Sequence, residues 1–103
     1  MISPLAFDTE NKICVAGEIV LSMDAYGHQS WDREIEFGQT FQRIPAFAAA
    51  LSRVDLKTDN KGHGLVRLYN FRVTNSSAKI TIHGYQSYLT TVNWIACLYV
   101  KVA

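Results

Sequence analysis

The densest group of hydrogen-bonding and aromatic side chains is the segment His83-Gly84-Tyr85-Gln86-Ser87-Tyr88. It places an imidazole, two phenol rings, an amide and a hydroxyl within six residues, at the end of an apolar-polar alternation. An aromatic ring can cover the C–H face of a sugar, while polar groups exchange hydrogen bonds with its hydroxyls. The segment therefore fits sugar binding, and it also fits an ordinary hairpin flanked by amphipathic tyrosines.

Patterns for catalysis and metal binding are weaker. Asp24, His28 and Ser30 have the residue types of a hydrolytic triad, but they share one short loop, whereas triads are assembled from separate elements. The sequence has no GxSxG motif, and its three histidines show neither HxH nor HxxxH spacing. We therefore expect a protein that is not an enzyme and that uses no metal and no cofactor.

The two cysteines, Cys14 and Cys97, are far apart in the sequence and match no CxxC or zinc-site spacing. Both lie in apolar stretches. Because free cysteine is among the most buried residue types, we expect two buried free thiols and no disulfide.

Alternating apolar and polar residues predict the elements that must position these groups. A period of two is typical of antiparallel strands with one buried face. It runs through residues 13–23, 31–37, 65–73, 78–83 and 92–102. Within 65–73, the residues Leu65, Tyr69, Phe71 and Val73 share one parity, so we expect them on the buried face. Turn-forming residues separate the segments, which predicts a sandwich or barrel.

The segment 46–56 is ambiguous, because its three successive alanines favour a helix. Its length and its neighbours favour a sixth strand that crosses a sandwich. Small residues on such a strand would allow another strand or a subunit to approach closely.

Composition limits the class of protein. The 103 residues fit a single domain, 1–103, with residues 1–10 as an N-terminal arm. A net charge of +1 argues against nucleic-acid binding, and no apolar run is long enough to insert into a membrane. The start of the chain shows no signal peptide, which predicts a cytoplasmic protein or one released by a non-classical route.

The shortage of charge points to an oligomer. Charged residues make up 18% of the chain, against about 25% in a typical soluble protein, so few positions are suited to solvent. The last predicted strand is apolar on both faces, with Ile95, Cys97 and Tyr99 on the second face. A strand of this kind is central in the fold or covered by a partner, so we expect a partner protomer to cover it.

A series of short motifs resembles the H-type lectin domain, the family of galactose- and N-acetylgalactosamine-binding agglutinins and discoidin C-terminal domains. The likeness covers roughly residues 12–100. Its motifs are Ile35-Glu36-Phe37, Phe41, Arg43-Ile44-Pro45, Val54-Asp55, Val66-Arg67-Leu68-Tyr69-Asn70 and Val92-Asn93-Trp94-Ile95-Ala96. The resemblance implies an all-β fold, a six-stranded antiparallel β-sandwich, that assembles as a trimer or a dimer of trimers. It also implies a glycan site between neighbouring protomers.

The resemblance further implies which residues bind the sugar. His83 and Tyr88 fall at the family's site histidine and tyrosine, and Asp24 lies nearest to its acidic residue. His63 stands where the family has an arginine. The cysteines do not stand where the family has a disulfide. The expected carbohydrate-binding residues are Asp24, His63, Arg67, His83, Tyr85 and Tyr88.

Two functions follow. The first is a non-enzymatic lectin for galactose-type glycans. The alternative is a structural or attachment subunit of a larger assembly, such as a virion or toxin part, with weak or no sugar binding.

Overall fold

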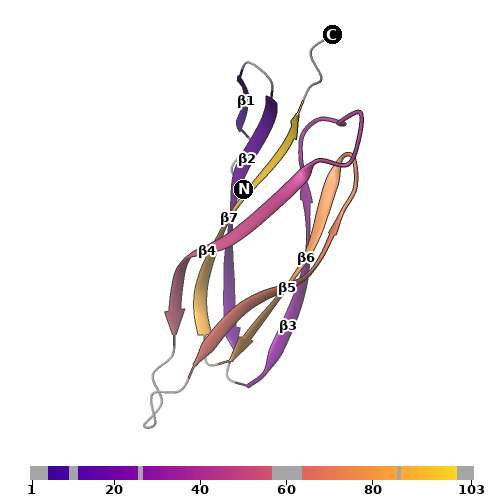
Figure 1. The fold of residues 1–103 in the computed structure, drawn as a ribbon. Helices are drawn as coiled ribbons and strands as arrows, with labels where there is room; N and C mark the ends of the chain where they lie inside the picture. Colours follow the sequence, from indigo (N-terminus) through magenta and orange to yellow (C-terminus); the bar gives the residue numbers. More distant parts are fainter. Residues whose placement is uncertain (1–4, 10–11, 26, 57–63, 86, 100–103) are drawn as a thin grey trace.

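The computed structural model describes residues 5–9, 12–25, 27–56, 64–85 and 87–99, with the backbone alone at 5–9, 23–25 and Leu56. This part of the chain contains strands and no helix, so it contains no helix that could span a membrane. The strands are β1 (Leu5–Thr9), β2 (Lys12–Ala25), β3 (Gln29–Glu36), β4 (Ala46–Leu56), β5 (Leu65–Val73), β6 (Ser77–Tyr85) and β7 (Ser87–Tyr99). They form two stacked sheets, which confirms the predicted all-β sandwich (Figure 1).

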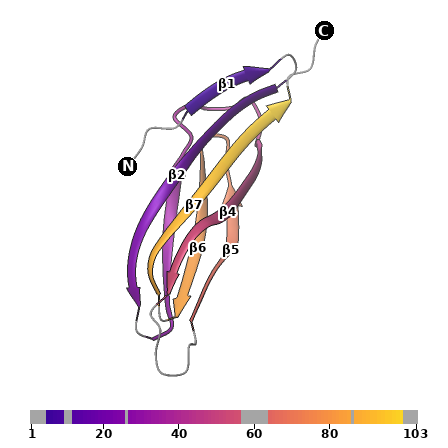
Figure 2. The ribbon, with the colours of Figure 1, turned by 90° about the vertical axis from the view of Figure 1, so that its left-hand side faces the viewer.

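Every neighbouring pair of strands is antiparallel. One sheet has the order β1-β2-β7-β4 and the other β3-β6-β5. Figure 2 shows β2, β7 and β4 in front of β6 and β5. Residues 5–9, which the sequence analysis assigns to an arm, pair with β2 as an additional short strand. The strand predicted at residues 46–56 is confirmed, because pairing with β7 outweighs the helix propensity of its alanines.

The core lies between the sheets and follows the predicted alternation on β2, β3, β6 and β7. Its fully buried members include Val15, Phe37, Ile80, Ile82 and Val92. The indole ring of Trp94 packs directly against Gly17. A Cβ atom added at residue 17 would lie 2.7 Å from this ring. Gly17 is therefore needed for the tryptophan to approach the backbone of β2.

The predicted buried face of β5 is wrong in its first half. Leu65 and Tyr69 point outward, each 40% exposed, while Val66 and Leu68 pack against the core. The register of β5 on β6 shifts between Tyr69 and Arg72, as in a β-bulge, so parity along the strand is not constant. At the shift Asn70 has φ 60°, a left-handed conformation that asparagine tolerates better than most residues.

The prediction of two free thiols is also wrong. Cys14 and Cys97 are directly opposite each other in the β2–β7 register and form a disulfide. Their separation of 83 residues hides this pairing from any local spacing rule. The bond ties the two central strands of the four-stranded sheet together.

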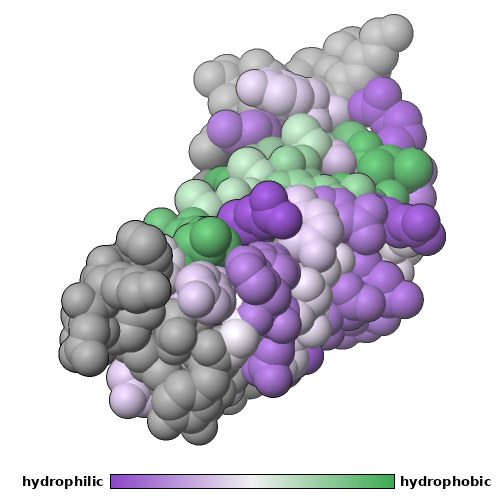
Figure 3. Space-filling model, turned by 90° about the horizontal axis from the view of Figure 1, so that it is seen from below, coloured by the Kyte–Doolittle hydropathy of each residue, from purple (hydrophilic) through white to green (hydrophobic). Residues whose placement is uncertain are grey.

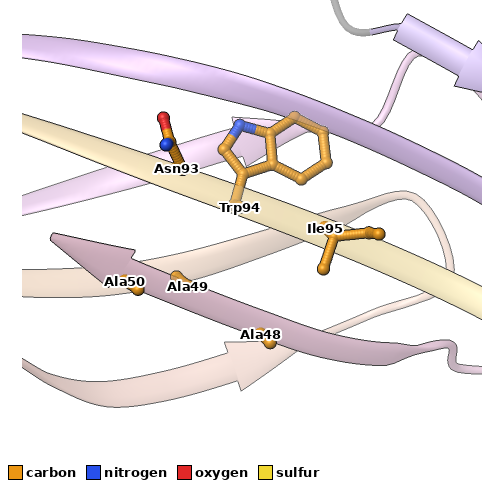
Figure 4. A pocket seen from close by; sticks show the side chains of 6 residues that line it. All are labelled: Ala48, Ala49, Ala50, Asn93, Trp94 and Ile95. Carbon is orange, nitrogen blue, oxygen red and sulfur yellow. The ribbon is translucent and has the colours of Figure 1, made fainter. Parts of the chain in front are cut away.

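The outer face of the four-stranded sheet is apolar, as predicted for the last strand. Val20 is 54% exposed, Ile95 36% and Tyr99 68%, while Trp94 and Ala96 on the other face of β7 are buried. Figure 3 shows hydrophobic residues gathered in one band of the surface, beside a broad hydrophilic area. A hollow of about 240 Å³, here called the alanine hollow, lies between β4 and β7 (Figure 4). Its lining is Ala48, Ala49, Ala50, Asn93, Trp94 and Ile95.

Candidate functional site

The candidate site lies on the outer face of the three-stranded sheet, near the end where β6 finishes and β3 and β5 begin (Figure 1). Ser30 of β3, His83 of β6 and Arg67 of β5 are register partners on one line across this sheet. Side chains on one face of a sheet recur at every second residue, so Tyr69 and Tyr85 lie on the same face as this line. Three segments that are distant in sequence thus meet here.

A chain of short contacts joins four of these side chains. The Tyr69 hydroxyl lies 3.2 Å from Ser30 Oγ, and Ser30 Oγ lies 2.9 Å from His83 Nδ1. On the other side of the ring, His83 Nε2 lies 3.0 Å from His28 Nδ1. We call the five residues His28, Ser30, Tyr69, His83 and Tyr85 the His83 cluster.

The hydrogen bonds of the His83 cluster can run in either direction. In one direction Tyr69 donates to Ser30, Ser30 donates to His83 Nδ1, and His83 Nε2–H donates to His28. In the other, every donor and acceptor is exchanged. Both directions require a neutral His83 that donates at one nitrogen and accepts at the other. In either direction one end of the chain offers a donor to a ligand and the other end an acceptor, and reversal exchanges the two.

Flat rings lie beside the hydrogen-bond chain. The His28 and Tyr85 rings are stacked, with centroids 4.5 Å apart and an interplanar angle of 10°. The Arg67 guanidinium lies 5.4 Å from the centre of the Tyr69 ring, within the range of a cation–π contact. Tyr69, His28 and Ser30 are exposed, so a ligand can reach both the rings and the polar groups.

The environment of His83 favours its neutral form. Loss of solvation lowers the pKa of His83 below its ordinary value of 6.5, and the positive charge of Arg67 and the nearby His28 lower this pKa further. The neutral ring is also the form that both directions of the hydrogen-bond chain require. The lowered pKa and the hydrogen-bond geometry therefore both favour a neutral His83 ring at neutral pH.

The structure brings together three of the six residues predicted to bind sugar, namely Arg67, His83 and Tyr85. Tyr88 lies at the start of β7 in the other sheet and is half exposed. Asp24 lies near the end of β2, but its side chain is outside the described residues, and so is all of His63.

Sequence reasoning missed Ser30, His28 and Tyr69 as neighbours of His83. It considered Ser30 and His28 only with each other, as parts of one polar loop. The signal was available in part, because an antiparallel pairing of β3 with β6 that buries Ile35 and Ile80 brings Ser30 opposite His83. Tyr69 could not be placed, since the parity of β5 hides its direction.

The Ser30–His83 contact has the distance of a nucleophile–base pair. Ser30 lies on the edge strand β3, and its hydroxyl is shared between His83 Nδ1 and the Tyr69 hydroxyl. No group of three metal-ligating His, Cys, Asp or Glu residues occurs among the residues described. The exposed hydroxyl and imidazole groups of this arrangement can exchange hydrogen bonds with a bound ligand.

The fold is similar to the solved structure of discoidin II of Dictyostelium discoideum, with a TM-score of 0.69 and 20% sequence identity. The match covers 89% of this chain and 39% of that chain, so the chain spans less than half the length of discoidin II. At this identity the likeness establishes the fold alone, a β-sandwich similar to part of discoidin II. No protein-family model and no curated protein matches the sequence.

Proposed function

We propose that this chain is a non-catalytic carbohydrate-binding domain whose sugar site is the His83 cluster. The observation that carries the proposal is the exposed chain of hydrogen-bonding groups beside stacked rings. Sugar hydroxyls both donate and accept, and a hydrogen-bond chain that can reverse its direction matches either role. The likeness of the fold to that of discoidin II supports carbohydrate binding as the general function.

Four residues at or beside the His83 cluster have distinct roles in this proposal. His28 and the Tyr69 hydroxyl, at the two ends of the chain, exchange hydrogen bonds with sugar hydroxyls. Tyr85 offers its ring to the C–H face of the sugar. Arg67 donates further hydrogen bonds and keeps His83 neutral. Asp24, His63 and Tyr88 belong to the proposal through the resemblance to H-type lectins.

The sugar class that we propose is galactose and N-acetylgalactosamine, again through that resemblance. We further propose that a neighbouring protomer of a trimer, or of a dimer of trimers, completes the site. One shallow site per chain binds a monosaccharide weakly, so several sites on one assembly would provide avidity for dense glycans.

Titration of the protein with galactose and with N-acetylgalactosamine, together with a glycan array, tests the proposal. The His83→Ala, Tyr85→Ala double variant should weaken binding by about tenfold or more, because it removes hydrogen bonds and a ring contact. Arg53→Ala, an exposed residue of β4 in the other sheet, is the control and should bind like the parent. A flat array and flat titrations with folded parent protein would rule out sugar binding.

Tyr88→Ala should be measured separately from the double variant. A loss of sugar affinity in this variant would add Tyr88 to the site, as the resemblance implies. Parental affinity would confine the site to the three-stranded sheet, because Tyr88 lies on β7.

The apolar outer face of the four-stranded sheet favours a second candidate, a structural or attachment subunit. Here the same face would hold the chain in a larger assembly, and the His83 cluster would bind sugar weakly or not at all. This candidate prevails if the parent binds no glycan and if Ile95→Asp, on the apolar face, lowers the native mass of the assembly. An unchanged native mass together with lost glycan binding in the His83→Ala, Tyr85→Ala variant would favour the lectin.

A further inference from the structure

A second polar feature lies on the same sheet face as the His83 cluster. It is a hollow of about 230 Å³, here called the Arg72 hollow. Its lining is Asp32, Asn70, Arg72, Lys79, Ile80 and Thr81. Lys79 precedes His83 by four residues on β6, which is about 13 Å along the strand. A ligand that touches both features must therefore be longer than a monosaccharide.

Two cations line the hollow, Arg72 and Lys79, and neither forms an ion pair among the described residues. Arg72 of β5 and Lys79 of β6 are direct register partners, and like charges in opposite positions destabilise a strand pair. Within the described ranges, neither side chain has a carboxylate oxygen within 4.0 Å. An anionic group bound beside both cations would therefore relieve their mutual repulsion.

Two acidic residues lie near these cations. Asp32 lines the hollow, and its Oδ1 accepts a hydrogen bond of 2.7 Å from Thr81 Oγ1. Glu34 is opposite Lys79 on β3, but in the described part of the chain it does not line the hollow and makes no ion pair with Lys79. Two cations and one carboxylate thus line the hollow.

The backbone of β5 is shaped to place Arg72 on this face. Tyr69 and Arg72 differ by an odd number of residues, so in a regular strand they would point to opposite faces. The register shift at Asn70 puts Arg72 opposite Lys79. Lys79 is four residues along β6 from His83, which is the register partner of Arg67. A non-glycine residue in the left-handed region costs free energy, and such outliers often mark binding sites.

From these observations we infer that the Arg72 hollow is an extension subsite for an acidic sugar residue, one carrying a carboxylate or a sulfate ester. The inference rests on the proposed function, since the neutral sugar of the same oligosaccharide occupies the His83 cluster. Arg72 and Lys79 bind the anionic oxygens, and Asp32 accepts a hydrogen bond from a ring hydroxyl. The preferred ligand is thus an acidic oligosaccharide that runs along β6.

Two probes separate this inference from the proposed function. The first compares a neutral galactose-containing oligosaccharide with matched sulfated and carboxylated forms. We expect one acidic form or both to bind at least about tenfold more tightly at low salt, because hydrogen bonds to charged groups are stronger than neutral ones. The Arg72→Gln, Lys79→Gln variant should lose this gain and keep parental affinity for the neutral form. The Arg43→Gln, Arg53→Gln variant removes the same charge outside this sheet and should keep the gain.

The second probe is inorganic sulfate, followed by amide resonances in NMR. Saturable shifts at residues 70, 72, 79 and 81 are expected, and the Arg72→Gln, Lys79→Gln variant should abolish them while His83→Ala keeps them. Equal affinity for neutral and acidic oligosaccharides would overturn the inference and leave the proposed function standing. Sulfate binding without any oligosaccharide binding would overturn both.

Discussion

Single side chains decide the protonation state of the candidate site. The pKa of His83 is lowered by lost solvation, by Arg67 and by His28, so Arg67→Gln should raise the pKa of His83 towards 6.5. The pH dependence of the His83 ring resonances in NMR measures this shift. Arg53→Gln, in the other sheet, is the control and should leave the titration unchanged. A His83 pKa that does not move in Arg67→Gln would show that lost solvation and His28 set it without Arg67.

The same pKa shift has a consequence for stability. A histidine with a lowered folded pKa binds fewer protons in the native state than in the unfolded chain. Its contribution therefore makes stability fall as pH drops from about 6.5 through the folded pKa, and it is constant above that range. Urea unfolding of the parent and of His83→Gln across this range isolates the contribution. A parent whose pH dependence equals that of His83→Gln would contradict it.

Two buried hydroxyls lack a partner among the described residues, Ser87 Oγ and Thr90 Oγ1. Thr90→Val removes such a hydroxyl while keeping the shape of the side chain, so it should raise the free energy of unfolding by about 1 kcal/mol. Thr81→Val is the opposite case, because Thr81 donates to Asp32, and it should lower stability by about 1.5 kcal/mol. Denaturant unfolding compares the two. A less stable Thr90→Val would show that a bound water satisfies Thr90.

At the scale of elements, the bulge in β5 depends on the backbone of Asn70. Its φ of 60° suits glycine and disfavours alanine. Asn70→Gly should therefore be as stable as the parent, and Asn70→Ala should lose about 1 kcal/mol in denaturant unfolding. Equal losses in both variants would mean that the asparagine side chain, and not the backbone conformation, holds the bulge.

The disulfide between β2 and β7 closes a long stretch of chain. Because its cysteines are 83 positions apart in the sequence, loss of the bond should lower the free energy of unfolding by roughly 4 kcal/mol through the entropy of the unfolded chain. Urea unfolding of Cys14→Ala, Cys97→Ala measures this loss, and reduction of the parent should produce a similar one. A double variant as stable as the oxidised parent would show that the sheet needs no covalent tie.

These two elements also show how far the sequence predicts the structure. Alternation predicts the strands and the core faces of β2, β3, β6 and β7 because each keeps one parity where it faces the core. It fails in β5, since one bulge reverses the parity at Asn70. It fails for the cysteines because the β2–β7 register, not local spacing, places Cys14 opposite Cys97. For the same reason it identifies His83 and Tyr85 but not Ser30, which joins them only through the pairing of β3 with β6.

At the scale of the molecule, the apolar outer face of the four-stranded sheet raises the question of what covers it. Val20, Ile95 and Tyr99 are exposed there, and the alanines of β4 leave the alanine hollow beside Ile95. A shortage of charge over the whole chain accompanies this face. Both features fit the trimer, or dimer of trimers, that we propose, because a protomer seated on this face would remove the apolar surface from water.

Native mass spectrometry of the parent should therefore give three or six times the protomer mass. Ile95→Asp should yield monomers, since assembly would bury a carboxylate that has no partner. Glu34→Arg reverses a charge at an exposed residue of β3, four residues from Ser30 on the three-stranded sheet, and should leave the assembly intact. Monomers from Glu34→Arg with an intact Ile95→Asp assembly would move the interface to the other sheet. A monomeric parent would exclude assembly and leave the His83 cluster to bind glycans alone.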